Sequence, residues 1–99
     1  MTHSHSIAAM APSEADVITR VRAFVQENFL YMYSNFQLAD DDCLLEKGVL
    51  DSMSIMEMVS FVEAQFGVTV LEEEITETNF GSVAGIARYI GQKRARAAA

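Results

Sequence analysis

The sequence predicts a single all-α domain: a four-helix bundle of three main helices and one short helix, with a long first loop. Apolar residues recur at helical spacing in three separate segments. The 99 residues are 51% hydrophobic with one proline and no tryptophan, which suits a compact helical protein. Residues 68–70 could form a strand by propensity, but one short strand has no partner in this chain. We expect the domain to cover residues 13–94, between flexible tails at 1–12 and 95–99.

The first helix is predicted to begin after Ser13 and to run to about Tyr31 or Tyr33. Ser13 is a good N-cap residue, and Asp16 places a negative charge in the first turn. The expected buried stripe follows at helical spacing and consists of Val17, Ile18, Val21, Phe24, Val25 and Phe29. Residues 35–47 have no such period, so we predict a long loop there. We expect its three leucines to anchor it to the core: Leu38, Leu44 and Leu45.

The second main helix is predicted to open at Asp51 or Ser52 and to end at Gly67 in the left-handed conformation. Its expected buried face consists of Ile55, Val59, Val62 and Phe66, with Met58 and Phe61 beside it. The methionines at 53, 56 and 58 cannot all share that face. Core packing and an adaptable surface near Ser52 therefore both stay open for them.

The remaining chain predicts a connector, a short helical segment and a last helix. Residues 68–70 are expected to be extended, and residues 72–77 to form one or two helical turns. Ser82 is predicted to cap the last helix, with Val83, Ile86 and Ile90 inward and Arg88 outward. Gly85 inside that helix costs up to ~1 kcal/mol relative to alanine, which indicates a close contact with another helix.

The net charge of −7 is concentrated in the acidic segment, residues 40–77, where eleven acids and one lysine leave −10. Such a segment repels nucleic acid and attracts proteins with basic faces, although ordinary solubility explains it equally well. No apolar run is long enough to span a bilayer. The single cysteine cannot form an internal disulfide, and residues 1–11 lack the basic start and sustained apolar stretch of a secretory signal. We therefore expect a cytoplasmic monomer.

Several catalytic chemistries fit the sequence poorly. Ser52 lacks the glycines of a nucleophile elbow, and the only histidines, His3 and His5, lie in the expected tail. Residues 40–51 open like a calcium loop but lack its central glycine and its final glutamate. Glu72 and Glu74 fit a solvated acidic face better than acid–base chemistry, and Cys43 among aspartates is a poor nucleophile. We expect no catalytic residue and no metal site.

Ser52 is the most informative polar residue, because it stands where the loop gives way to a helix. A helix N-terminus offers free N–H groups and a positive dipole end, so a phosphate could be held there. A plain N-cap serine explains the position without any function. From position alone the plain cap is the better interpretation.

The residues around Ser52 resemble the acyl carrier protein family. Residues 45–53 read Leu-Glu-Lys-Gly-Val-Leu-Asp-Ser-Met, and an apolar helix follows that ends in Phe-Gly at 66–67. The family signature is Asp-Ser-Leu, preceded by a glycine and followed by such a helix. The resemblance covers about residues 17–90. It implies that a phosphopantetheinyl transferase, using magnesium and coenzyme A, attaches 4′-phosphopantetheine to Ser52, with Asp51 supporting that enzyme.

The resemblance also implies the role of the attached arm and its partners. The arm would carry an acyl or aminoacyl thioester from a loading ligase to downstream transferase or synthase enzymes. Ser54, Ala64 and Gln65 replace acids common in fatty-acid carriers, which weakens a general fatty-acid role. The Gly-Val-Leu-Asp-Ser opening at 48–52 and the Asn-Phe pair at 79–80 look more like freestanding carriers of specialised pathways. An unmodified acidic adaptor that only binds partner proteins is the alternative. The expected partner-binding residues are Met53, Met56, Glu57, Glu63, Glu72 and Glu73.

Overall fold

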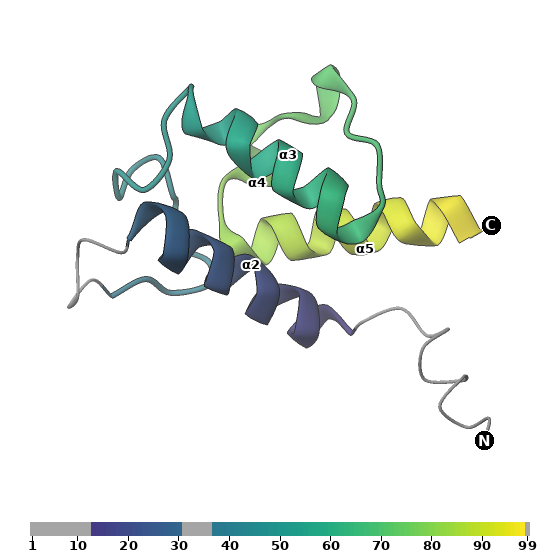
Figure 1. The fold of residues 1–99 in the computed structure, drawn as a ribbon, viewed down its shortest axis with the longest axis horizontal. Helices are drawn as coiled ribbons and strands as arrows, with labels where there is room; N and C mark the ends of the chain where they lie inside the picture. The colour runs from purple at the N-terminus through teal and green to yellow at the C-terminus, as the bar shows by residue number, and fades with distance from the viewer. Residues whose placement is uncertain (1–12, 31–36, 99) are drawn as a thin grey trace.

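The computed structural model describes residues 13–30 and 37–98, and within them the chain is all-helical with no strand. Its main helices are α2 (Glu14–Phe29), α3 (Ser54–Phe66) and α5 (Val83–Ala98), and the short α4 (Glu77–Phe80) precedes α5. α2 and α5 pack against each other, and α3 lies across this pair at the top of Figure 1. The predicted four-helix bundle of three main helices and one short helix is confirmed.

α2 begins as predicted and ends earlier than predicted. The Ser13 hydroxyl accepts a hydrogen bond from the Asp16 N–H at 3.2 Å, as an N-cap does. The helix stops at Phe29, because Leu30 leaves the helical conformation and its N–H donates to the Val25 carbonyl. The predicted end at Tyr31 or Tyr33 was therefore too late, and those two tyrosines lie outside the described residues.

The described part of the first loop is fastened to the start of α5. The Leu44 N–H donates to the Gly81 carbonyl at 2.8 Å, and the Ala84 N–H donates to the Asp40 carbonyl at 2.7 Å. Leu38 and Leu44 are buried as predicted, whereas Leu45 is 49% exposed. The expectation for Leu45 was wrong, because residues 44–48 form turns in which Leu44 is buried and residues 45–48 are exposed.

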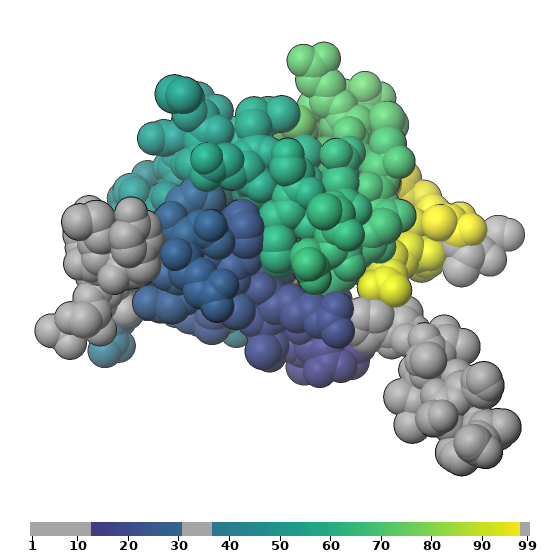
Figure 2. Space-filling view, viewed as in Figure 1, coloured from purple at the N-terminus to yellow at the C-terminus, as the bar shows by residue number. Residues whose placement is uncertain are grey.

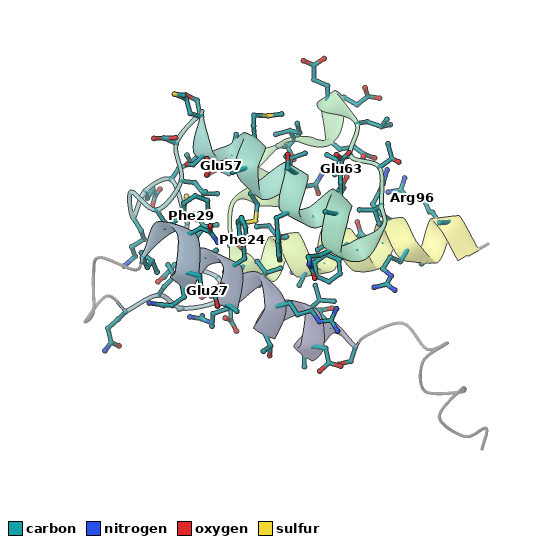
Figure 3. The ribbon with its side chains drawn as sticks, in the orientation of Figure 1. Phe24, Glu27, Phe29, Glu57, Glu63 and Arg96 are labelled. Atoms are coloured by element: carbon teal, nitrogen blue, oxygen red, sulfur yellow. The ribbon has the colours of Figure 1, made fainter. Side chains whose placement is uncertain are left out.

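The core lies between the three main helices and includes the two leucines of the loop. α3 contributes Met58, Val59, Val62 and Phe66, and Met58 is fully buried whereas Ile55 is only partly so. The sequence interpretation had assigned these two residues the reverse ranks. At the side of the core the Phe24 ring of α2 stacks on the Phe61 ring of α3 at 4.0 Å between centroids. Figure 3 shows Phe24 and Phe29 between these two helices.

The chain after α3 follows the predictions closely. Gly67 caps the helix with φ of 67°, residues 68–71 form neither helix nor strand, and Leu71 is extended. The segment 72–77 is more divided than predicted, with a 3₁₀ turn η1 (Glu72–Glu74) followed by the separate helix α4. Gly85 packs closely on α4, since a Cβ there would lie 2.9 Å from the Thr78 carbonyl oxygen. The Ser82 hydroxyl caps α5 through the Gly85 N–H, and α5 continues to Ala98, past the predicted boundary at 94.

Candidate functional site

Ser52 lies in a turn directly before α3, and its side chain is exposed. Leu50, two residues earlier, is buried and holds the turn against the core. The predicted helix opening at Asp51 or Ser52 was slightly early, because α3 itself begins at Ser54. The Asp51 carbonyl nevertheless accepts the first helical hydrogen bond, from the Ile55 N–H at 3.0 Å. Asp51 therefore caps the turn that leads into α3.

The Asp51 carboxylate occupies the N–H groups at the start of the helix. Its Oδ1 accepts hydrogen bonds from the Met53 N–H at 3.0 Å and from the Ser54 N–H at 2.8 Å. The expectation of free N–H groups beside Ser52 was wrong for these two groups. Ser52 itself is exposed in the turn between Leu50 and α3. A phosphate attached to it would meet the charge of Asp51 and would not replace these capping bonds.

Ser54 completes this cap with two further hydrogen bonds to Asp51. Its hydroxyl donates to Asp51 Oδ1 at 2.9 Å and accepts from the Asp51 N–H at 2.9 Å. These hydrogen bonds, first from the Ser54 backbone N–H and then from its hydroxyl, lower the pKa of the Asp51 carboxyl. Asp51 is therefore ionised at neutral pH and is a weak base.

An exposed apolar pair borders Ser52. Met53 is 82% exposed and Met56 is 52% exposed, whereas Met58 lies in the core. Met56 lies in the first turn of α3, four residues after Ser52. Both interpretations that were open for the methionines therefore apply. Met58 packs in the core, and Met53 and Met56 lie on the surface. Figure 2 shows the exposed side of α3, in teal, above α2.

The four acids expected to bind partners differ in their surroundings. Glu57 is exposed on α3, and Glu72 and Glu73 are exposed on η1, which stands out from the body in Figure 1. Glu63 is half-buried, and its Oε2 accepts a hydrogen bond from the Val70 N–H at 2.9 Å. Figure 3 shows Glu57 and Glu63 near opposite ends of α3. Glu63 thus supports the connector after α3, a role that the sequence did not indicate.

Glu74 is part of a polar cluster that binds η1 to α5. Its Oε1 accepts hydrogen bonds from the Tyr89 hydroxyl at 2.8 Å and the Lys93 ammonium at 2.9 Å, and from the Leu71 N–H. These donors, Lys93 first, lower the pKa of Glu74 to about 2. Burial, and then the bond to Glu74, raise the pKa of Tyr89. The expected solvated face at Glu72 and Glu74 is therefore wrong for Glu74, whose side chain is 16% exposed.

Two side chains of the loop between α2 and α3 also contact other helices. The Arg22 guanidinium of α2 donates to Asp40 Oδ1, with Nε at 3.1 Å. The Cys43 thiol lies 3.6 Å from Glu77 Oε2 and is half-buried. Within residues 13–30 and 37–98, no three His, Cys, Asp or Glu side chains gather as metal ligands would. His3 and His5, which belong to the expected N-terminal tail, lie outside these ranges.

Sequence reasoning missed two features of this region. The spacing of Asp51 and Ser54, three residues apart at a helix start, is that of a capping pair and could have revealed their reciprocal bonds. The Glu74 cluster had no local signal, because Tyr89 and Lys93 come from a helix fifteen and nineteen residues further along the chain.

No described helix is long and apolar enough to cross a membrane.

Comparison with known proteins finds similarity among solved structures. No protein-family model and no curated protein matches the chain. Among solved structures, a chain from one named "Crystal structure of FAD-dependent dehydrogenase" is similar, with a TM-score of 0.63 and 33% identity. The match covers 71% of this chain and 97% of that chain, which is therefore only about 72 residues long. At this identity and coverage, the present chain belongs to the same protein family as that short chain.

Proposed function

We propose that this protein is a carrier that holds an acyl or aminoacyl group on a 4′-phosphopantetheine arm attached to Ser52. The observation that supports this proposal best is the position of Ser52. Its exposed hydroxyl follows an ionised, anchored Asp51 at the start of a rigid helix. The residues around it have the Asp-Ser pattern of acyl carrier proteins, in register with the cap at Gly67.

The attachment chemistry would be supplied by a separate transferase. The Ser52 Oγ attacks the β-phosphorus of coenzyme A, and a P–O bond forms while the pyrophosphate P–O bond breaks. Adenosine 3′,5′-bisphosphate leaves with that electron pair, and the serine proton passes to a base of the transferase. Asp51, with its lowered pKa, is a fixed negative charge in this step rather than the base.

The bound arm supplies a thiol that holds cargo as a thioester. The chain's own contribution is to present that cargo at a high effective concentration to an enzyme docked beside Ser52. The exposed apolar side chains of Met53 and Met56 and the charge of Glu57 are available for such docking. A partner with an apolar patch rimmed by basic residues suits this surface.

The test is an intact-mass measurement of the protein after incubation with coenzyme A, magnesium and a broad-specificity phosphopantetheinyl transferase. We expect the wild type and Ser60→Ala to gain one phosphopantetheine mass and Ser52→Ala to gain none. Ser60 is the matched control, since it is an exposed serine on α3, the helix that follows Ser52. If the wild type gains no such mass, the carrier proposal fails and an unmodified acidic adaptor becomes the better interpretation.

The name of the matched structure suggests a class of partner. The matched chain is about 72 residues long, and a chain of that size has one small core. The five glycines of the present chain also form no dinucleotide-binding fingerprint. We infer that an FAD-dependent dehydrogenase acts on the cargo and that this chain does not itself hold the flavin.

A flavin-binding measurement tests whether the name of the matched structure describes a partner of this chain or the chain itself. FAD is titrated with the isolated protein while flavin fluorescence and equilibrium dialysis are followed. We expect no retention of FAD and unchanged fluorescence. Stoichiometric retention would show that the chain itself is a flavoprotein and would overturn the inference of a dehydrogenase partner.

A further inference from the structure

The Asp51 carboxylate is held by one oxygen only. All three of its hydrogen bonds, from the Met53 N–H, the Ser54 N–H and the Ser54 hydroxyl, end on Oδ1. Within the described part of the chain, Oδ2 accepts no hydrogen bond. Because Asp51 is exposed, this second oxygen can accept a cation or a donor from outside the molecule.

Ser54 determines how firmly this arrangement is held. Its hydroxyl both donates to the carboxylate and accepts from the Asp51 N–H, so it bonds the side chain and the backbone of the same residue. This pair of bonds limits rotation of the Asp51 side chain and of the peptide that leads into Ser52. The hydroxyl completes the reciprocal capping pair through the Asp51 N–H, and it adds a third contact on Oδ1 that the two backbone N–H groups alone would not supply.

We propose that Ser54 is a positioning residue for the modification of Ser52, holding Asp51 so that Oδ2 faces outward for the transferase. This inference rests on the proposed carrier function. The group that Oδ2 would receive is a cation of the transferase site, either its magnesium ion or a basic side chain. Ser54 touches neither the phosphate nor the coenzyme, and it acts only through Asp51.

Charge and geometry agree with this role. An ionised carboxylate with one saturated oxygen presents a single, directed negative charge one residue from the nucleophile. Loss of the Ser54 hydroxyl leaves the two backbone bonds to Oδ1 in place, so the helix cap survives. The carboxylate would then rotate more freely, and docking of the transferase would weaken more than the chemical step.

The test compares rates of Ser52 modification by one transferase for the wild type, Ser54→Ala, Ser54→Thr and Ser60→Ala. Removal of the hydroxyl in Ser54→Ala is expected to lower kcat/KM for the carrier about fivefold to tenfold, chiefly through a higher KM. Threonine retains the hydroxyl, so Ser54→Thr should return to within about twofold of the wild type. Ser60→Ala should match the wild type.

A second readout separates positioning from loss of structure. The pKa of Asp51, followed by carboxyl-carbon NMR, should rise in Ser54→Ala and return in Ser54→Thr, while helix content stays constant. An unchanged kcat/KM in Ser54→Ala, or a loss that threonine does not rescue, would overturn the proposal. If the wild type is not modified on Ser52, the carrier function itself fails. A modified wild type beside an equally modified Ser54→Ala refutes only the role of Ser54.

Discussion

Two methionines on α3 provide a direct test of how this helix is rotated and therefore of which surface borders Ser52. Met58 is fully buried, whereas Met56, two residues earlier, is 52% exposed. Truncation of Met58 to alanine removes Cγ, Sδ and Cε from the core. These atoms are worth about 2 kcal/mol of transfer free energy, and the cavity left behind brings the total to about 3 kcal/mol. Met56→Ala removes the same atoms from the surface and should change stability by less than about 0.5 kcal/mol.

Thermal unfolding followed by circular dichroism measures the difference. For a domain of this size each kcal/mol shifts Tm by about 4–8 °C, so Met58→Ala should unfold about 12–24 °C below the wild type. Met56→Ala should stay within about 4 °C of it. Equal losses, or a larger loss for Met56, would refute the rotation of α3 described above. Met53 and Met56 would then no longer be assigned to the surface beside Ser52.

Three further predictions concern pH, backbone packing and the modified state. The pKa of Glu74 is about 2 in the folded protein and 4.5 by reference, so its bonds stabilise the fold above pH 4.5 and are lost toward pH 2. Urea unfolding should therefore show a larger difference between the wild type and Glu74→Gln at pH 6 than at pH 3, and equal differences would contradict this reasoning. In thermal unfolding, Gly81→Ala should cost about 3 kcal/mol or more, since its Cβ would lie 2.2 Å from the Glu77 carbonyl oxygen. Gly91→Ala, which meets nothing within 4 Å on the exposed side of α5, should instead add up to about 1 kcal/mol, and a loss there would contradict the open surroundings. Attachment of a phosphodiester at Ser52 should raise the pKa of Asp51, because the added negative charge opposes its ionisation, and an unchanged NMR titration after modification would show that the phosphate lies away from this carboxylate.

Local signals in the sequence predicted the helices and most of their ends. Ser13 and Ser82 cap helices because a serine oxygen three residues before an N–H needs no tertiary partner. Gly67 ends α3 because the left-handed conformation costs glycine little. The end of α2 was less predictable. Its apolar stripe continues in the sequence, and the helix stops at Phe29 without a glycine or proline to mark the place.

The candidate site was predictable in position and only partly in geometry. The pattern around Ser52 identified the exposed serine at the start of a helix, which the structure places there. The spacing of Asp51 and Ser54 indicates a capping pair, but it does not decide whether a carboxylate or a phosphate takes the Met53 and Ser54 N–H groups, since both suit a helix N-terminus. The burial of Glu74 needed the tertiary packing of η1 on α5. Glu72, Glu73 and Glu74 look alike in the sequence, and only the fold shows that Glu74 is the one whose side chain is largely buried.

The fold reduces how much of the acidic segment a partner can use. A carboxylate that is bonded within the chain already has cationic or N–H donors, so an approaching base gains less from it than from a solvated one. Glu63 and Glu74 are bonded in this way, to Val70 and to Lys93. Glu57 is exposed on the same helix as Met53 and Met56, so charge and apolar surface meet there. Recognition of this protein by a basic partner should therefore depend on Glu57 more than on Glu63, although the sequence pattern ranks these two helix acids equally.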